Sequence, residues 1–381
     1  MDTFDEANWT TAVNESSING TAAFIVFDNI TDMATYCQQR PWAPADTAFK
    51  WVAFAMAFLV ILVGLAGNGL VCYLVTFSAK INSLIDILIM NMAVSDLLTS
   101  FLYSLLVVYV LAIGYWPFDG IVCTIYAYLV VVFIQVSTYT MVAISINRYI
   151  AVIWPFWTRT KSNHTKSIIF FVWLIPIVSS YPITSITELN QPSAWYKKCG
   201  TFICYSTYKN QNLKLVYKEA LTTLHVFIPI STLIFTYSSI GVVLWRKKTP
   251  GEAQHPGDLH AARSKIKMIR MIKMMVIVVI AFAVSWTPFS TFLKRATVEP
   301  SMSLSIWDDN ASMWFTLYFL GMSHTCYNPI IYYWMNKDYR QGFKAVFSRV
   351  FGLCTCFGNV RRRLLTTQGS QQSQQSQFIK T

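Results

Sequence analysis

Seven long stretches with almost no charged side chain constrain this 381-residue sequence more than any other feature. Asp96 is the single charge inside them, and they cover residues 51–79, 87–118, 120–147, 167–187, 220–245, 274–293 and 310–336. About 20 apolar residues in a helix span the ~30 Å hydrocarbon core of a bilayer, and each stretch reaches that length. Charged residues make up 13% of the chain, about half of the ~25% usual in soluble domains. The sequence therefore predicts an all-α bundle of seven transmembrane helices.

The charges between these stretches predict how the chain lies in the membrane. One set of segments carries 21 Lys and Arg against 4 Asp and Glu: residues 80–86, 148–166, 246–273 and 337–381. The alternate segments carry 9 against 13: residues 1–50, 119, 188–219 and 294–309. Because Lys and Arg gather in cytoplasmic loops, we expect a multi-pass plasma-membrane protein with its N-terminus outside. The net charge of +12 then indicates a face that attracts anionic membrane lipids, and it does not indicate nucleic-acid binding.

Four segments follow from this topology. Residues 1–50 form an extracellular tail, residues 51–336 the membrane domain, residues 337–357 an amphipathic membrane-surface helix, and residues 358–381 a polar tail expected to be disordered. The first tail is predicted to be glycosylated, because four sequons begin there, at Asn8, Asn14, Asn19 and Asn29.

Two cysteines, Cys354 and Cys356, follow the amphipathic segment on the inner side. Juxtamembrane cysteines in this position are typical palmitoylation sites, and two free cytosolic thiols are the alternative.

Each apolar stretch also carries polar or proline-containing positions, which are costly in lipid and usually functional or paired. In chain order these are Gly67-Asn68, Asp96, Asn147-Arg148-Tyr149, Trp173, Pro229 with Tyr237, Phe282 with Trp286-Thr-Pro288, and Asn328-Pro329-Ile-Ile-Tyr332. A single proline indicates only a helix kink. The ordered set, one motif for each stretch, resembles the rhodopsin-like (class A) G protein-coupled receptors from about Lys50 to Phe357.

The resemblance implies a receptor without catalytic activity that binds an extracellular ligand and activates a heterotrimeric G protein. Ligand binding would shift Trp286 and Phe282 against the kink at Pro288, and the inner end of that helix would swing outward. This is a two-state equilibrium that a ligand biases. The inner residues implied to rearrange or to contact the G protein are Asn147, Arg148, Tyr149, Tyr237, Asn328, Pro329 and Tyr332. Receptor kinases and arrestin, acting on the Ser- and Thr-bearing tail, are further implied partners.

The same resemblance implies a disulfide and an ion site. Cys123 matches the cysteine that is bonded to the second outer loop, where Cys199 and Cys204 are both candidates. The family's sodium pocket is matched by Asp96, Ser137, Trp286 and Asn328, so an allosteric sodium ion is the one candidate cofactor. His324 stands where Asn or Ser is more usual. The alternative for Asp96 is a neutral, hydrogen-bonded carboxylic acid, which burial favours.

One departure concerns Arg148. The family usually has an acidic residue before this arginine, where the sequence has Asn147, and Met268 stands where a sixth-helix partner is often found. Losing the partner of a buried charge costs several kcal/mol. We therefore hypothesise elevated signalling without ligand; the alternative is that Asn147 accepts a hydrogen bond from Arg148 and little changes.

The nature of the ligand is narrowed by two positions. Val130 stands where aminergic receptors carry an aspartate, and Met322 stands where opsins carry the retinal-binding lysine. The run from Met322 to Asn336 is similar to the neuropeptide Y, tachykinin and RFamide-type receptors, so an extracellular peptide ligand is expected. Family geometry then implies a pocket lined by Val130, Ile134, Lys218, Leu221, His225, Leu293, Arg295, Trp314 and Tyr318.

Other functions remain as alternatives. Cations around the outer end would also suit a lipid or small anionic ligand on the same fold. Transporters of this kind show internal repeats with broken helices, and no repeat is evident. An enzyme needs clustered titratable groups, whereas Asp96, His225 and His324 lie on separate stretches, so an enzyme is not expected.

Overall fold

The computed structural model describes residues 33, 35–37, 47–78, 83–107, 114–154, 163–191, 194–206, 211–246, 256–298 and 311–349. Predictions for Asn8, Asn14, Asn19, Asn29, Cys354 and Cys356, and for the side chains of Lys218 and Met268, lie outside this description. The chain divides into two compact units, Met1–Arg40 and Pro41–Thr381. Residues 33 and 35–37 of the first are helical. The second contains everything described below.

Six helical segments are long and apolar enough to cross a membrane, from Trp51–Phe77 to Ile272–Arg295. The first four lie in α2 (Thr47–Phe77), α3 (Leu84–Val107), α4 (Gly120–Ile153) and α5 (Asn163–Ser180), which η3 (Tyr181–Ser185) extends. The fifth is α7 (Gln211–Thr222), η4 (Thr223–Phe227) and α8 (Ile228–Arg246), and the sixth is α9 (Pro256–Val298).

The seventh apolar stretch is divided at Ser323 into α11 (Ala311–Met322) and α12 (His324–Met335). Each half has 12 residues, so neither alone is long enough to cross a bilayer. Together they supply the seventh pass that the charge-poor stretch 310–336 predicts, and the seven-helix prediction is confirmed.

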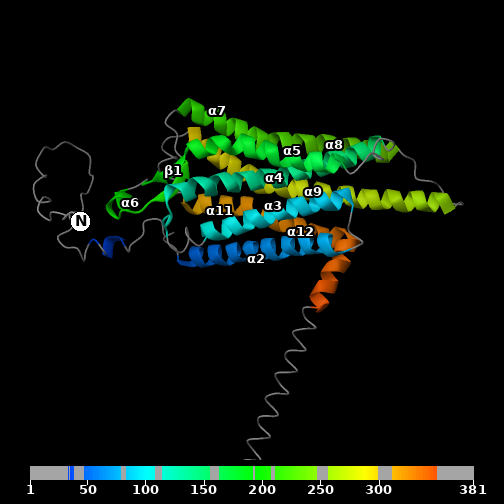
Figure 1. Ribbon diagram of the computed structural model, residues 1–381, viewed down its shortest axis with the longest axis horizontal. Helices are drawn as coiled ribbons and strands as arrows, with labels where there is room; N and C mark the ends of the chain where they lie inside the picture. Colours follow the sequence, from blue (N-terminus) through cyan, green and yellow to red (C-terminus); the bar gives the residue numbers. More distant parts are fainter. Residues whose placement is uncertain are drawn as a thin grey trace, which may run out of the picture. The chain divides into compact units, whose positions relative to one another are not determined.

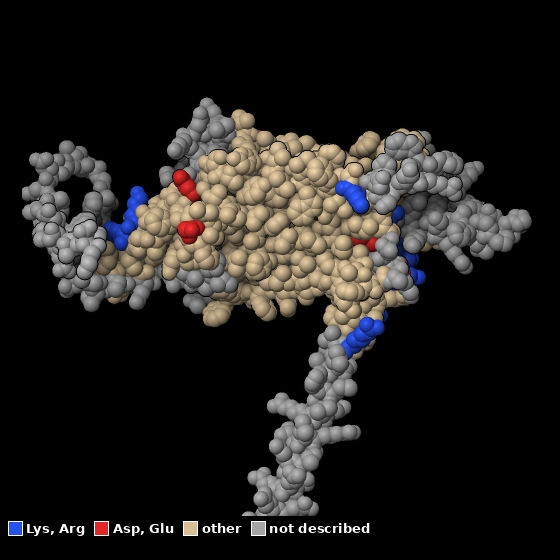
Figure 2. Space-filling view, in the orientation of Figure 1, with Lys and Arg blue, Asp and Glu red and all other residues tan. Residues whose placement is uncertain are grey.

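Large apolar side chains on the outer surface of the bundle have no protein contact to bury them. Phe58, Phe171, Val178 and Ile234 are all largely exposed. In Figure 2 the middle of the visible face is free of described Lys, Arg, Asp and Glu, which lie toward its two ends. A wide apolar surface between two polar ends is what a lipid bilayer requires.

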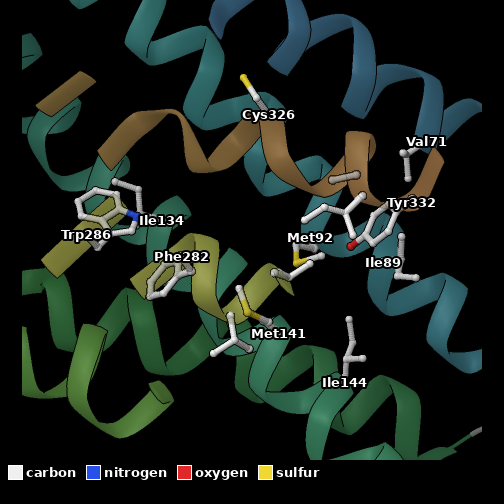
Figure 3. Packing of buried hydrophobic residues seen from close by; sticks show 14 of the residues in the cluster. Val71, Ile89, Met92, Ile134, Met141, Ile144, Phe282, Trp286, Cys326 and Tyr332 are labelled. Carbon is white, nitrogen blue, oxygen red and sulfur yellow. The ribbon is translucent and has the colours of Figure 1, made fainter. Parts of the chain in front are cut away.

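The helices pack into a closed bundle (Figure 1). Helix α3 contacts α2 and α4, α4 contacts α5 and α8, α9 contacts α8, α11 and α12, and α12 returns to α2. Most buried apolar residues form one continuous cluster through the centre, including Met92, Ile134, Phe282 and Tyr332 (Figure 3). The core therefore connects the outer and inner halves of the bundle.

A hairpin in the second outer loop, which the sequence did not predict, is held against the start of α4. Strands β1 (Thr187–Asn190) and β2 (Ile203–Ser206) pair antiparallel, and the short helix α6 (Ala194–Lys198) lies between them in sequence. Asp119 caps α4 by accepting a hydrogen bond from the Val122 amide at 2.9 Å. A disulfide joins Cys123 to Cys204, so Cys204 and not Cys199 is the partner. Cys199 is disulfide-bonded as well.

A further helix follows α12 and covers residues 337–349. It turns Tyr339 and Phe343 into the core, while Gly342 faces Leu74 so closely that an added Cβ would come within 2.7 Å of that side chain. This amphipathic segment thus packs on the inner end of α2, and the end proposed for it at residue 357 lies beyond the described residues.

Candidate functional site

Four aromatic rings from three parts of the chain meet in the middle of the bundle. The Trp286 ring lies 5.0 Å from His225, 5.5 Å from His324 and 6.4 Å from Phe282, measured between centroids. Trp286 is 5% exposed, and Figure 3 shows it pointing into the core beside Ile134. Edge-to-face packing at these distances stabilises one relative orientation of the rings over other orientations. A ligand that moves one ring must therefore shift the others.

The local backbone explains how two of these rings reach the centre. His225 lies in η4, a single π-helical turn before Pro229, and such turns rotate side chains away from their α-helical positions. Trp286 lies two residues before Pro288, the proline inside α9. The sequence signals the proline, but it carries no comparable signal for the π turn.

Below this cluster lies the fully buried carboxyl group of Asp96, with 0% exposure. Asn328 Nδ2 donates a hydrogen bond to Asp96 Oδ2 at 2.7 Å. His324 Nε2 lies 3.8 Å from Oδ1, which accepts no hydrogen bond. The Ser137 hydroxyl lies beside the same carboxyl group without a direct hydrogen bond. Asp96, Ser137 and Asn328, three of the four residues matched to the sodium pocket, thus lie together. The fourth, Trp286, reaches them only through its contact with His324.

These groups do not fit a sodium ion well. Hard cations take oxygen ligands, and the free oxygens of Asp96 and Ser137 would qualify. The imidazole nitrogen of His324, however, faces Asp96 Oδ1 at 3.8 Å, and a nitrogen is a poorer ligand for sodium than an oxygen. Among the described residues no group of three or more His, Cys, Asp or Glu is arranged to hold a metal ion.

Three hydrogen bonds from intramembrane side chains reach neighbouring helices. Asn68 Nδ2 donates to the carbonyl oxygens of Gly64 and Thr325 at 2.9 and 2.8 Å. Trp173 Nε1 donates to Asn91 Oδ1 at 2.9 Å, and Asn91 Nδ2 donates to Thr140 at 2.8 Å. These bonds satisfy groups that would be costly in lipid. Their role here is to join α2 to α12 and α3 to α4 and α5.

At the inner end of α4, Arg148 is half-buried, and in the described part of the chain it forms no ion pair. Its Nε has no hydrogen-bond partner. Asp86 and Tyr237 are the titratable groups that interact electrostatically with the Arg148 guanidinium. No hydrogen bond between Asn147 and Arg148 is present either. The structure thus places Arg148, Tyr237 and Tyr332 at the inner end of the bundle, and no described carboxylate forms an ion pair with the arginine.

The carboxylate of Asp86 accepts hydrogen bonds from Ser83 and Tyr339, and it forms none with Arg148. Its Oδ2 accepts hydrogen bonds from the Ser83 amide and hydroxyl, at 2.9 and 2.6 Å, at the start of α3. Its Oδ1 accepts from the Tyr339 hydroxyl at 3.2 Å, and the Tyr339 ring packs on Tyr332 at 5.6 Å. Burial, followed by the charge of Asp86, raises the pKa of the Tyr339 phenol, which keeps its donor proton. The sequence did not single out Asp86 or Tyr339.

The outer pocket residues are brought together only in part. Val130, Ile134 and Tyr318 belong to the central cluster, and Leu293 and Trp314 pack against it. Arg295 is exposed, and Leu221 is half-buried on α7. The salt bridge between Lys294 and Glu219, at 2.7 Å, joins the outer ends of α9 and α7.

Tyrosines add a feature of this pocket that the sequence did not reveal. Tyr318 stacks on Trp314 at 4.9 Å and lies 5.9 Å from Tyr103, whose buried hydroxyl has no partner. Tyr126 packs on Trp116 of the first outer loop at 5.4 Å. The outer half of the bundle therefore brings aromatic faces and phenol groups together, and a helical spacing of aromatics alone could not have distinguished this cluster from ordinary core.

Comparisons with known proteins agree with this arrangement. The family model described as 7 transmembrane receptor (rhodopsin family) matches residues 67–332. The RYamide receptor of Drosophila melanogaster is 36% identical over 328 residues, which cover 84% of this chain and 69% of that protein. The RYamide receptor of Tribolium castaneum is 35% identical, over 82% of this chain and 84% of its own length. The tachykinin-like peptides receptor 99D of Drosophila melanogaster is 30% identical, over 76% and 55%. The chain belongs to the rhodopsin family of seven-transmembrane receptors, a family of receptors and not of enzymes, and it is a multi-pass membrane protein.

Proposed function

We propose that this protein is a plasma-membrane receptor, with its N-terminus outside, that binds a peptide ending in an amide and activates a heterotrimeric G protein. The observation that carries the proposal is the similarity to RYamide receptors of two insects, which extends over more than four fifths of the chain. The aromatic outer pocket supports it, because phenol groups and ring faces suit an aromatic, amide-bearing peptide end.

The geometry suggests how binding reaches the inner face. A ligand between Trp314, Tyr318 and Phe289 presses on Trp286, whose ring lies 6.1 Å from that of Phe289. Trp286 and Phe282 lie two and six residues before Pro288 in α9, the point at which this helix bends most easily. Movement of α9 below the proline uncovers Arg148 and Tyr237 for the G protein. The ligand can shift this equilibrium only by its difference in affinity for the two states.

The test is a peptide panel applied to cells that express the full chain. The probe is a short synthetic peptide ending in Arg-Tyr-amide. Its controls are the same peptide as a free acid and with the last two residues exchanged. Calcium and cyclic AMP are both measured, in parallel with mock-transfected cells. We expect the amide to activate receptor-bearing cells alone, and the free acid to be at least tenfold weaker.

Two outcomes would contradict the proposal. If the free acid and the amide are equally potent, the terminal amide is not recognised. If no peptide acts and a lipid extract does, the ligand class is wrong.

Further partners are proposed on the sequence alone. The Ser- and Thr-bearing tail, residues 358–381, would be phosphorylated by receptor kinases and would then bind arrestin. Cys354 and Cys356 would carry palmitoyl chains that hold the preceding helix to membrane lipids. Because Asn147 stands before Arg148 in place of an acidic residue, basal signalling would exceed that of receptors with an acidic residue at this position.

A further inference from the structure

The hydrogen bonds of His324 determine which of its ring nitrogens carries a proton. His324 Nδ1 lies 2.8 Å from the carbonyl oxygen of Gly321. A carbonyl oxygen only accepts hydrogen bonds, so Nδ1 must be the donor. In a neutral imidazole the other nitrogen, Nε2, then has a lone pair and no proton. His324 is 4% exposed, and it cannot turn to water to escape this arrangement.

That lone pair faces a second acceptor. His324 Nε2 lies 3.8 Å from Asp96 Oδ1, about 1 Å longer than an ordinary hydrogen bond. Neither atom has a hydrogen-bond partner. An ionised carboxylate and an imidazole lone pair repel each other across this gap. A fully buried carboxylate without a balancing charge is also costly. One proton between the two atoms removes both costs, whichever atom holds it more tightly.

The remaining groups around Asp96 do not offer another solution. Asn328 donates to the other carboxyl oxygen, and Ser137 is an uncharged hydroxyl. The titratable neighbours Cys72, Cys326 and Tyr332 interact with Asp96, and none of them can carry a positive charge. His225 interacts with His324, but its nitrogens make no hydrogen bond. Among the described residues, His324 is therefore the group placed to balance Asp96.

We propose that His324 pairs with the Asp96 carboxyl group across the 3.8 Å between Nε2 and Oδ1, and that this pair takes the place of a sodium ion at the centre of this receptor. With one proton on either atom the pair has no net charge, and His324 Nε2 faces the Asp96 oxygen that has no hydrogen-bond partner. His324 also contacts Trp286 at 5.5 Å and Phe282 at 6.1 Å. It thus positions Asp96 relative to the rings that the proposed ligand moves, although the proposal holds whatever the ligand is.

The test compares the unfolding temperature of the purified full-length receptor in sodium chloride and in potassium chloride at equal ionic strength. The wild-type protein is expected to unfold at the same temperature in both salts. His324→Ser and His324→Asn replace the nitrogen by oxygen-bearing side chains, the types more usual here. We expect sodium, and not potassium, to raise the unfolding temperature of both variants by roughly 3 °C. Adding Asp96→Asn to either variant should abolish the rise.

A sodium-specific rise in the wild-type protein overturns the proposal, and this measurement needs no variant to fold. The proposal is also overturned if sodium fails to raise the unfolding temperature of both His324→Ser and His324→Asn. His324 would then not be the group that replaces the ion. A failed peptide panel would leave these results unchanged, since no ligand is added in this experiment.

Discussion

Arg148 is a half-buried cation with no ion pair in the described parts of the bundle, and its neighbour Asn147 supplies no charge. Asn147→Asp would place a carboxylate next to it and stabilise the resting state by about 1 kcal/mol, a modest value for a partly buried pair. We expect basal signalling to fall roughly fivefold. The measurement is ligand-free second-messenger production at equal surface expression.

The control for this substitution is Asn190→Asp on the outer strand β1. It adds the same charge far from Arg148 and keeps the oxygen that accepts the Gln191 amide at 2.7 Å. Basal signalling should not change in this control. Equal basal signals for Asn147→Asp and the unmodified protein would show that Arg148 does not limit the resting state.

Trp286 is the residue through which the outer and inner halves of the core touch. In Trp286→Ala the contacts to His225, His324 and Phe289 are lost, and a cavity remains that costs about 3–5 kcal/mol. We expect the maximal agonist response to fall at least tenfold when corrected for surface expression, and Trp286→Phe to recover part of it. Trp51→Ala, at a position 71% exposed on the outer surface of α2, is the matched control. An intact response in Trp286→Ala would contradict the proposed mechanism.

At the scale of helices, the seven passes could be predicted because lipid imposes a minimum length and excludes charge. The prolines inside α9 and α12, Pro288 and Pro329, were expected from the sequence to be positions of easy bending. The π turn at Thr223–Phe227 and the break at Ser323 could not be predicted, because both depend on how a helix fits its neighbours. The resemblance placed His324 in the pocket of Asp96, but the direction in which its Nε2 points could not be predicted, because it depends on packing.

Helix α2 offers a test of how closely the helices must pack. An added Cβ at Gly67 would lie 2.7 Å from Pro329 Cγ, whereas one at Gly69 would meet nothing within 4 Å. Gly67→Ala should therefore destabilise the fold by about 1–3 kcal/mol, since the proline ring cannot yield. Gly69→Ala should stabilise it by about 0.5–1 kcal/mol, because alanine favours a helix. Thermal unfolding of the two purified variants checks this, and equal unfolding temperatures would contradict the close contact of α2 with α12.

For the molecule as a whole, one covalent bond joins the bundle to its outer hairpin. The disulfide between Cys123 and Cys204 spans 81 positions, and closing a loop of that size stabilises a fold by about 4 kcal/mol. We expect Cys204→Ser to reduce surface expression severely and to lower the unfolding temperature. Cys72→Ser, which changes a free cysteine, should have little effect. Normal expression of Cys204→Ser would show that the hairpin is held by its other contacts.

The largest-scale feature of the sequence is its charge asymmetry, 21 cations against 4 anions on one side and 9 against 13 on the other. Because it predicts the topology, an N-terminal epitope tag should be labelled by antibody on intact cells, and a C-terminal tag only after permeabilisation. Enzymatic removal of N-glycans should increase electrophoretic mobility. Two more sequons begin at Asn310, in a predicted outer segment, and at Asn163, in a predicted inner one. Replacing Asn8, Asn14, Asn19 and Asn29 together by Gln should leave at most the shift due to Asn310. Asn163→Gln should change nothing. An N-terminal tag hidden on intact cells would reverse the topology, and with it the assignment of Arg148 to the G protein side.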